Sequence, residues 1–135
     1  MPKQKAPNNR TLTLSSAETE QYADELLTLT GEVTVDFLLN QTICQNVLEV
    51  LPWLPDSFVD LLIVDPPYNR SKNFNGAAFK ARSVDAYEDW LMTWVSQLPR
   101  LLKPTASIYM CCDWQSSNAI YQVFAEHFRV RNRIT

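Results

Sequence analysis

A run of four residues, Asp65-Pro66-Pro67-Tyr68, combines a carboxylate, two prolines and an aromatic ring. It directly follows the apolar run 61–64, which predicts a strand buried on both faces, as in a parallel sheet. Proline has no backbone N–H to donate to a sheet, so the two prolines end the strand and stiffen the turn after it. The sequence therefore predicts an acid and a ring on a rigid turn at the carboxyl end of a strand, where open α/β sheets bind ligands.

The chemistry that suits this turn is the binding of a flat exocyclic amine. A carboxylate beside carbonyl groups freed by proline offers several acceptors to the amine hydrogens. Accepting them draws the nitrogen lone pair out of conjugation with the ring, so that the nitrogen can attack. The Tyr68 ring can stack on the base that carries the amine, as side chains do around a base flipped out of a duplex. The alternative interpretation is an ordinary strand-to-turn joint, because Asp and Pro are common turn residues.

The segment Asp65-Pro66-Pro67-Tyr68-Asn69 resembles the catalytic motif of the DNA amino-methyltransferases, which methylate adenine or cytosine on the exocyclic nitrogen with S-adenosylmethionine. The resemblance runs from about Thr42 to the C-terminus and includes residues 46–52 and 107–110. It is similar to the subclass in which the catalytic motif comes early and the cofactor motif late. The aspartate form of the motif is more typical of adenine enzymes than of cytosine enzymes.

This resemblance implies roles for individual residues. Asp65 and the Pro66 carbonyl would accept hydrogen bonds from the target amine, Pro67 belongs to the same catalytic motif, and Tyr68 would stack on the flipped base. Asp65 would also contact the cofactor. Asn46 is a second candidate cofactor contact, because it stands where related enzymes often carry an aspartate. No metal is required for such a transfer.

The charge distribution predicts a DNA-binding segment directly after the motif. The net charge is −3, yet residues 1–69 hold three basic and ten acidic side chains, whereas residues 70–135 hold nine basic and five acidic ones. A long polar loop over the site, at 69–83, could neutralise the phosphates of double-stranded DNA. The alternative is a solvated surface loop. The predicted DNA contacts are Asn69, Arg70, Lys72, Lys80 and Arg82.

One family feature is missing from the sequence. Related enzymes carry a Phe-x-Gly-x-Gly turn that lets the backbone approach the cofactor, but this chain has only two glycines, Gly31 and Gly76. We therefore expect an α/β fold with a partial Rossmann-like methyltransferase sheet, in which mostly parallel strands with flanking helices lack the cofactor-binding half. We also expect an amino-terminal fragment of a longer enzyme, whose partner would be the missing carboxyl-terminal half or another copy of the chain.

The remaining elements follow from caps, breakers and periodicity. Residues 1–14 are predicted to be a flexible tail and residues 15–135 the catalytic-motif half of a methyltransferase domain. Ser15 and Glu18 have the spacing of a capping box, which predicts a helix that continues to Gly31. Further predicted elements are a strand at 42–44, a helix at 46–53, a helix at 84–101, a second buried strand at 106–112, a helix at 116–127 and a final strand at 128–133.

Composition excludes several other classes. Three cysteines without a C-x-x-C spacing and a single histidine argue against a zinc site. Cys111 and Cys112 are predicted to face opposite sides of a strand as small apolar residues. The sequence has neither an apolar run of membrane-spanning length nor a signal peptide at its start, which predicts a cytoplasmic protein without a membrane partner.

The main functional hypothesis is a site-specific adenine DNA methyltransferase, of the kind found in restriction-modification systems, that acts on a flipped base. One alternative is a cytosine amino-methyltransferase of the same family, or the same chemistry on an amine of RNA or protein. Another is a non-catalytic remnant or a DNA-binding partner that needs a second chain.

Overall fold

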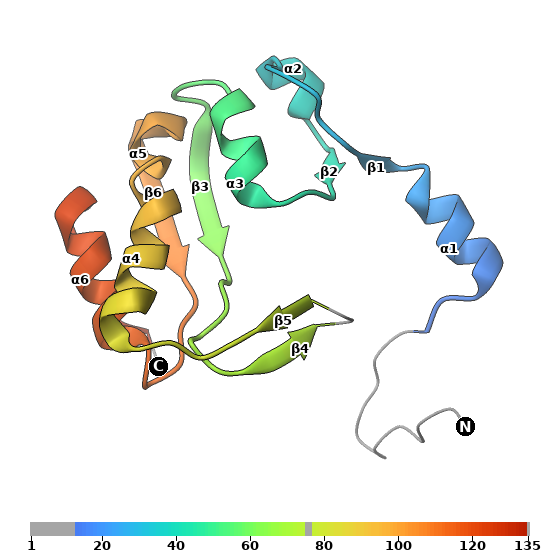
Figure 1. Cartoon of the computed structure of the whole chain (residues 1–135). Helices are drawn as coiled ribbons and strands as arrows, with labels where there is room; N and C mark the ends of the chain where they lie inside the picture. The colour runs from blue at the N-terminus through green and yellow to red at the C-terminus, as the bar shows by residue number, and fades with distance from the viewer. Residues whose placement is uncertain (1–12, 75–76, 135) are drawn as a thin grey trace, which may run out of the picture.

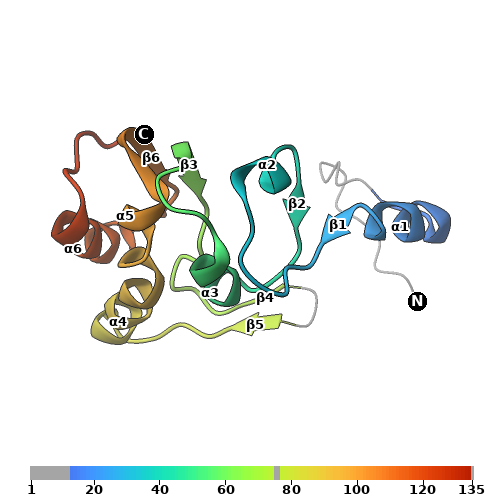
Figure 2. The same cartoon turned by 90° about the horizontal axis from the view of Figure 1, so that it is seen from above.

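A parallel pair of strands forms the centre of the molecule. The computed structural model describes residues 13–74 and 77–134. Strand β3 (Val59–Val64) pairs in parallel with β6 (Leu102–Met110), and helices α4 (Val84–Val95) and α6 (Ser117–His127) lie together on one side of this pair (Figures 1 and 2). The result is a mixed α/β arrangement with parallel strands and flanking helices, as the sequence predicted.

The hydrophobic core lies between the two helices and one face of the strand pair. Apolar residues recur at helical spacing on α4 and α6, so each helix presents one stripe to the core. Leu62 and Val64 of β3, with Ile108 and Met110 of β6, pack against that stripe. The buried residues of the cluster are Leu51, Tyr87, Leu91, Trp94, Val95, Leu98, Leu101, Ala119, Ile120, Val123 and Phe124.

The other face of the strand pair is exposed, so the prediction of strands buried on both faces is wrong. Leu61 and Ile63 are 54% and 67% exposed, and Tyr109, the register partner of Ile63, is 51% exposed. Successive side chains of a strand point to opposite faces, and α4 and α6 pack against only one of these faces. Cys111 and Cys112 were predicted to lie within this strand, but they follow its end at Met110 and both are exposed.

The N-terminal elements form an extended arm. Helix α1 (Ser16–Ala23) has the predicted capping box between Ser15 and Glu18. It ends at Ala23 rather than Gly31, because Leu26–Leu27 form strand β1, which pairs in parallel with β2 (Thr42–Ile43). None of the residues of α1 is buried, so tertiary packing does not extend the helix.

Short helices lie between β1 and β3. Helix α2 (Val35–Leu38) precedes β2, and α3 (Val47–Val50) continues into a 3₁₀ turn, η1 (Leu51–Trp53), much as predicted for residues 46–53. The predicted helix at 84–101 is divided into two helices: α4 ends at Val95, and α5 spans Leu98–Leu101.

Two further predictions are wrong. Within the predicted loop 69–83, β4 (Lys72–Phe74) and β5 (Ala77–Phe79) form an antiparallel hairpin, whose residues 75–76 lie outside the described part. The alternating run 128–133 forms no strand with any described residue, since alternation alone cannot supply the backbone partners that a strand needs. In Figure 1 the hairpin extends from the carboxyl end of β3.

Candidate active site

The turn that follows β3 brings the predicted acid and ring together. Asp65 is exposed, Pro66 is buried, and Tyr68 is partly buried. The Tyr68 hydroxyl donates a hydrogen bond to the Asp65 carboxylate. This bond, with a smaller contribution from burial, raises the pKa of Tyr68 to about 12. The phenol therefore stays protonated at neutral pH and remains a donor to Asp65.

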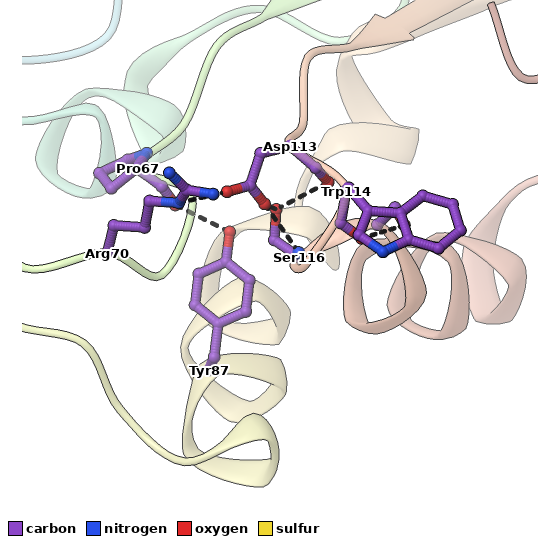
Figure 3. A network of polar contacts seen from close by, with 7 residues as sticks. Pro67, Arg70, Tyr87, Asp113, Trp114 and Ser116 are labelled. Carbon is purple, nitrogen blue, oxygen red and sulfur yellow. Dashed lines mark hydrogen bonds and ion pairs between the residues drawn. The ribbon is translucent and has the colours of Figure 1, made fainter. Parts of the chain in front are cut away.

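A buried tyrosine from α4 holds the same turn from below. The Tyr87 hydroxyl donates to the Pro67 carbonyl at 2.8 Å, and the Tyr87 side chain is 1% exposed (Figure 3). Burial, with the nearby Asp113 carboxylate as a second cause, raises the pKa of Tyr87 to about 12. From the sequence, Tyr87 is predicted only as part of the helix at 84–101. The signal that could have found its role is the hydroxyl itself, because a buried tyrosine O–H usually finds an acceptor.

An ion pair joins the turn to the carboxyl end of the neighbouring strand. Arg70 Nε lies 2.5 Å from Asp113 Oδ2, and Asp113 Oδ1 accepts from the backbone N–H and hydroxyl of Ser116 at 2.8 and 2.7 Å (Figure 3). The bonds from Ser116, and then the Arg70 guanidinium, hold the pKa of Asp113 below its usual range. Asp113 thus connects the turn after β3 to the start of α6.

The base of the hairpin is closed by Asn69. Its side-chain amide donates to the Arg82 carbonyl at 3.0 Å and accepts from the Arg82 N–H at 2.9 Å. Asn69 has a φ of 54°, a left-handed conformation that asparagine tolerates better than most residues. The Arg82 guanidinium lies over the rings of Phe79 and Trp90, at 5.4 and 5.8 Å from their centroids. Asn69 and Arg82 therefore fix the hairpin to α4.

The five residues predicted to contact DNA fall into two groups. Arg70, Asn69 and Arg82 make the intramolecular contacts just described, although Arg70 is still 62% exposed at its side chain. Lys72 lies on β4 and Lys80 directly after β5, and both are exposed on the hairpin. The contact of all five residues with DNA stays a prediction.

Asn46, the second predicted cofactor contact, caps a helix. Its side chain accepts from the Leu48 N–H at 3.1 Å at the start of α3. Next to it, the Gln45 side chain bonds both the N–H and the carbonyl of Leu29, at 2.5 and 2.9 Å. Both side chains thus have structural partners, and a cofactor role for Asn46 stays a prediction.

The described residues do not form a cradle that fits S-adenosylmethionine. Gly31 is the one glycine among them, and a Cβ added there would meet no atom within 4 Å, so nothing approaches its backbone closely. Two hollows in the described surface lie away from the turn, one beside residues 52–56 and Arg100, the other between residues 22–27 and 40–42. Neither hollow is lined by residues of the turn.

Two other features are absent from the described ranges 13–74 and 77–134. No three His, Cys, Asp or Glu side chains gather there in a way that could hold a metal ion. No helix in these ranges combines the length and the apolar character needed to cross a membrane.

Comparison with known protein families shows to which family the chain belongs. The model of the DNA methylase family, of the N6/N4 methyltransferase class, matches residues 59–135. This chain belongs to the DNA methylase family. The matched segment begins at the first residue of β3 and contains the turn, the hairpin, α4, β6 and α6, so the whole candidate site except Asn46 lies within it.

Individual methylases resemble the chain over part of their length. It is 33% identical over 89 residues to the DNA adenine methyltransferase YhdJ of Escherichia coli (strain K12), covering 66% of this chain and 30% of that protein. It is 30% identical over 84 residues to the type II methyltransferase M.HpaI of Haemophilus parainfluenzae, covering 62% and 26%. For M.BamHI of Bacillus amyloliquefaciens the identity is 33% over 63 residues, covering 47% and 15%. The matched part is less than a third of each of these relatives.

Proposed function

We propose that this chain carries the amine-binding part of an S-adenosylmethionine-dependent methyltransferase that acts on the exocyclic amine of adenine in DNA. The observation that carries the proposal is the hydrogen bond from the Tyr68 hydroxyl to the Asp65 carboxylate, on a turn at the carboxyl end of β3 and inside the segment matched by the methylase family. Adenine is favoured over cytosine by the aspartate of the motif and by the likeness to YhdJ, which is named an adenine methyltransferase.

The carbonyl groups of the two prolines differ in their hydrogen bonding. The Pro67 carbonyl already accepts from Tyr87, so the Pro66 carbonyl is the better candidate for the amine. Asp65 has capacity left beside its bond to Tyr68, because a carboxylate offers about four acceptor positions. We therefore assign the two amine hydrogens to Asp65 and the Pro66 carbonyl, while the Tyr68 ring stacks on the flipped base.

The donor side of the reaction is proposed from the family alone. Because the described residues form no cradle for S-adenosylmethionine, our mechanism is limited to binding and orienting the acceptor. We propose that the cradle comes from a partner, either a further polypeptide or a second copy of the chain. In the assembled enzyme, β3 and β6 would be neighbouring strands of a Rossmann-like sheet.

Double-stranded DNA is the proposed partner on the outer side of the site. Lys72 and Lys80, exposed on the hairpin beside the turn, would contact phosphates, and Arg70 would hold the turn in place. Several relatives are named type II methyltransferases, which supports a proposed place in a restriction-modification system.

The proposal is tested by following labelled methyl from S-adenosylmethionine to mixed-sequence DNA. We expect the chain to label DNA once a carboxyl-terminal methylase segment that supplies the cofactor cradle is added, and Asp65→Ala to abolish that label. The matched control is Asp60→Ala, which removes an exposed aspartate of the same strand and only a surface ion pair with Lys103. Digestion of the DNA to nucleosides then distinguishes methylated adenine from methylated cytosine.

Each outcome decides a different point. Equal labelling by Asp65→Ala would refute the assigned chemistry, and label on cytosine would correct the base. Without label in any variant, even after addition of a carboxyl-terminal methylase segment, the chain would be assigned the non-catalytic role of a DNA-binding partner.

A further inference from the structure

The turn at residues 65–70 makes contacts with three other parts of the chain. The Pro67 carbonyl accepts from Tyr87, Asn69 is bonded to the Arg82 backbone, and Arg70 is paired with Asp113. The contact with Tyr87 is the most deeply buried of the three, and it is the nearest in sequence to the acid and the ring. It is therefore the contact best placed to control their geometry.

The position of the Pro67 carbonyl directly affects Tyr68. The peptide that joins Pro67 to Tyr68 is planar, so a hydrogen bond to its carbonyl oxygen restrains the orientation of that plane and with it the position of the Tyr68 Cα. The Tyr68 hydroxyl in turn bonds the Asp65 carboxylate. A single chain of contacts thus leads from Tyr87 through Pro67 and Tyr68 to Asp65.

Tyr87 is itself firmly anchored. Its helix, α4, buries Leu91, Trp94 and Val95 in the core, and the Tyr87 ring stacks on Trp90 with centroids 5.6 Å apart. Burial raises its pKa from the ordinary value of 10.0 to about 12, so the hydroxyl is protonated and available as a donor to the turn at neutral pH.

We propose that Tyr87 is a positioning residue of this site, whose hydroxyl fixes the Pro67–Tyr68 peptide and thereby the spacing between the Tyr68 ring and the Asp65 carboxylate. The inference rests on the proposed function, since it names a residue that supports the same amine-binding turn. The competing explanation is that Tyr87 only fills the core and that its hydroxyl bonds the nearest carbonyl without affecting Asp65 or Tyr68.

The first test observes the turn itself and needs no catalytic activity. In Tyr87→Phe, the packing ring remains and only the hydroxyl is lost. We expect the ¹³C resonances of the Asp65 carboxylate and the Tyr68 ring to shift at neutral pH, while the melting temperature changes little. Tyr121→Phe, which removes an exposed hydroxyl from α6, should leave both resonances in place. Unchanged Asp65 and Tyr68 resonances in Tyr87→Phe would overturn the inference.

The second test separates positioning from binding. We expect Tyr87→Phe to lower kcat by about ten- to a hundredfold, because small displacements of a reacting group are costly, and to leave KM for DNA unchanged, because Tyr87 is buried. Full kcat in Tyr87→Phe, in a preparation where Asp65→Ala is inactive, would remove the positioning role. Activity in Asp65→Ala would instead refute the proposed function, and the resonances would still report on Tyr87.

Discussion

The N-terminal arm and the body of this chain are held together by different forces. The arm, residues 13–45, consists of short elements, and its helix α1 has no buried residue. The body, from residue 59 on, has a continuous core between α4, α6 and the β3–β6 pair. The family match covers the body alone, and so does the candidate turn. The short elements of the arm are therefore joined by hydrogen bonds such as the β1–β2 pairing and the bonds of Gln45 to Leu29, whereas the geometry of the site depends on packing in the core.

The largest effect that separates the two regions should come from the core. Leu91 is fully buried on α4, one turn after Tyr87, and Leu91→Ala should lower the free energy of unfolding by about 2–5 kcal/mol, through lost burial and the cavity left behind. Leu39→Ala is the matched control in the arm, where the side chain is 58% exposed, and it should change stability by no more than about 0.5 kcal/mol. Urea unfolding followed by tryptophan fluorescence measures both. Equal losses would show that arm and body unfold as one unit.

A smaller, pH-dependent effect is expected at the rim of the site. The folded-state pKa of Asp113 is lowered from 3.8, chiefly by its bonds to Ser116 and then by Arg70. Its ionised form therefore stabilises the fold above this ordinary value, and the contribution is lost as the pH falls through the lowered pKa. Asp113→Asn should accordingly be less stable than the wild type at neutral pH, with a difference that shrinks in acid.

Urea midpoints at stepwise lower pH measure this difference. Asp89→Asn, which removes an exposed aspartate of α4, controls for the loss of one negative charge. A difference between Asp113→Asn and the wild type that stays constant down to acid pH would contradict a stabilising role of the ionised carboxylate.

Particular residues show what the sequence could and could not predict. Helical spacing predicted α6 almost to the residue, because this spacing reflects burial of one helix face, which the fold provides. The apolar run 61–64 predicted a strand followed by a turn, and both are present. The run 61–64 was wrongly expected to be buried on both faces of the sheet, since the sequence does not reveal whether helices cover one face or both. The acid and the ring were proposed as site residues from their types and spacing, and the structure places them in contact, while their role in the site stays a prediction.

The supports of the turn were not predicted, because they depend on contacts between distant residues. Tyr87 reaches Pro67 across 20 positions, and Arg70 meets Asp113 from a different strand end. Likewise, the hairpin depends on Asn69 reaching Arg82. In each case one side chain satisfies a backbone group or charge that composition and periodicity do not specify.

The smallest effect is expected in α1, whose N-terminal cap joins residues only three positions apart. The Ser15 hydroxyl accepts from the Glu18 N–H, and the Glu18 carboxylate accepts from the Ser15 N–H in return. Ser15→Ala should reduce the helicity of α1 by weakening this cap, at a local cost of about 1 kcal/mol. Because α1 buries no residue, the urea midpoint of the body should not move. Circular dichroism for the helix and tryptophan fluorescence for the body separate the two responses, and a shifted body midpoint would show that α1 supports the core after all.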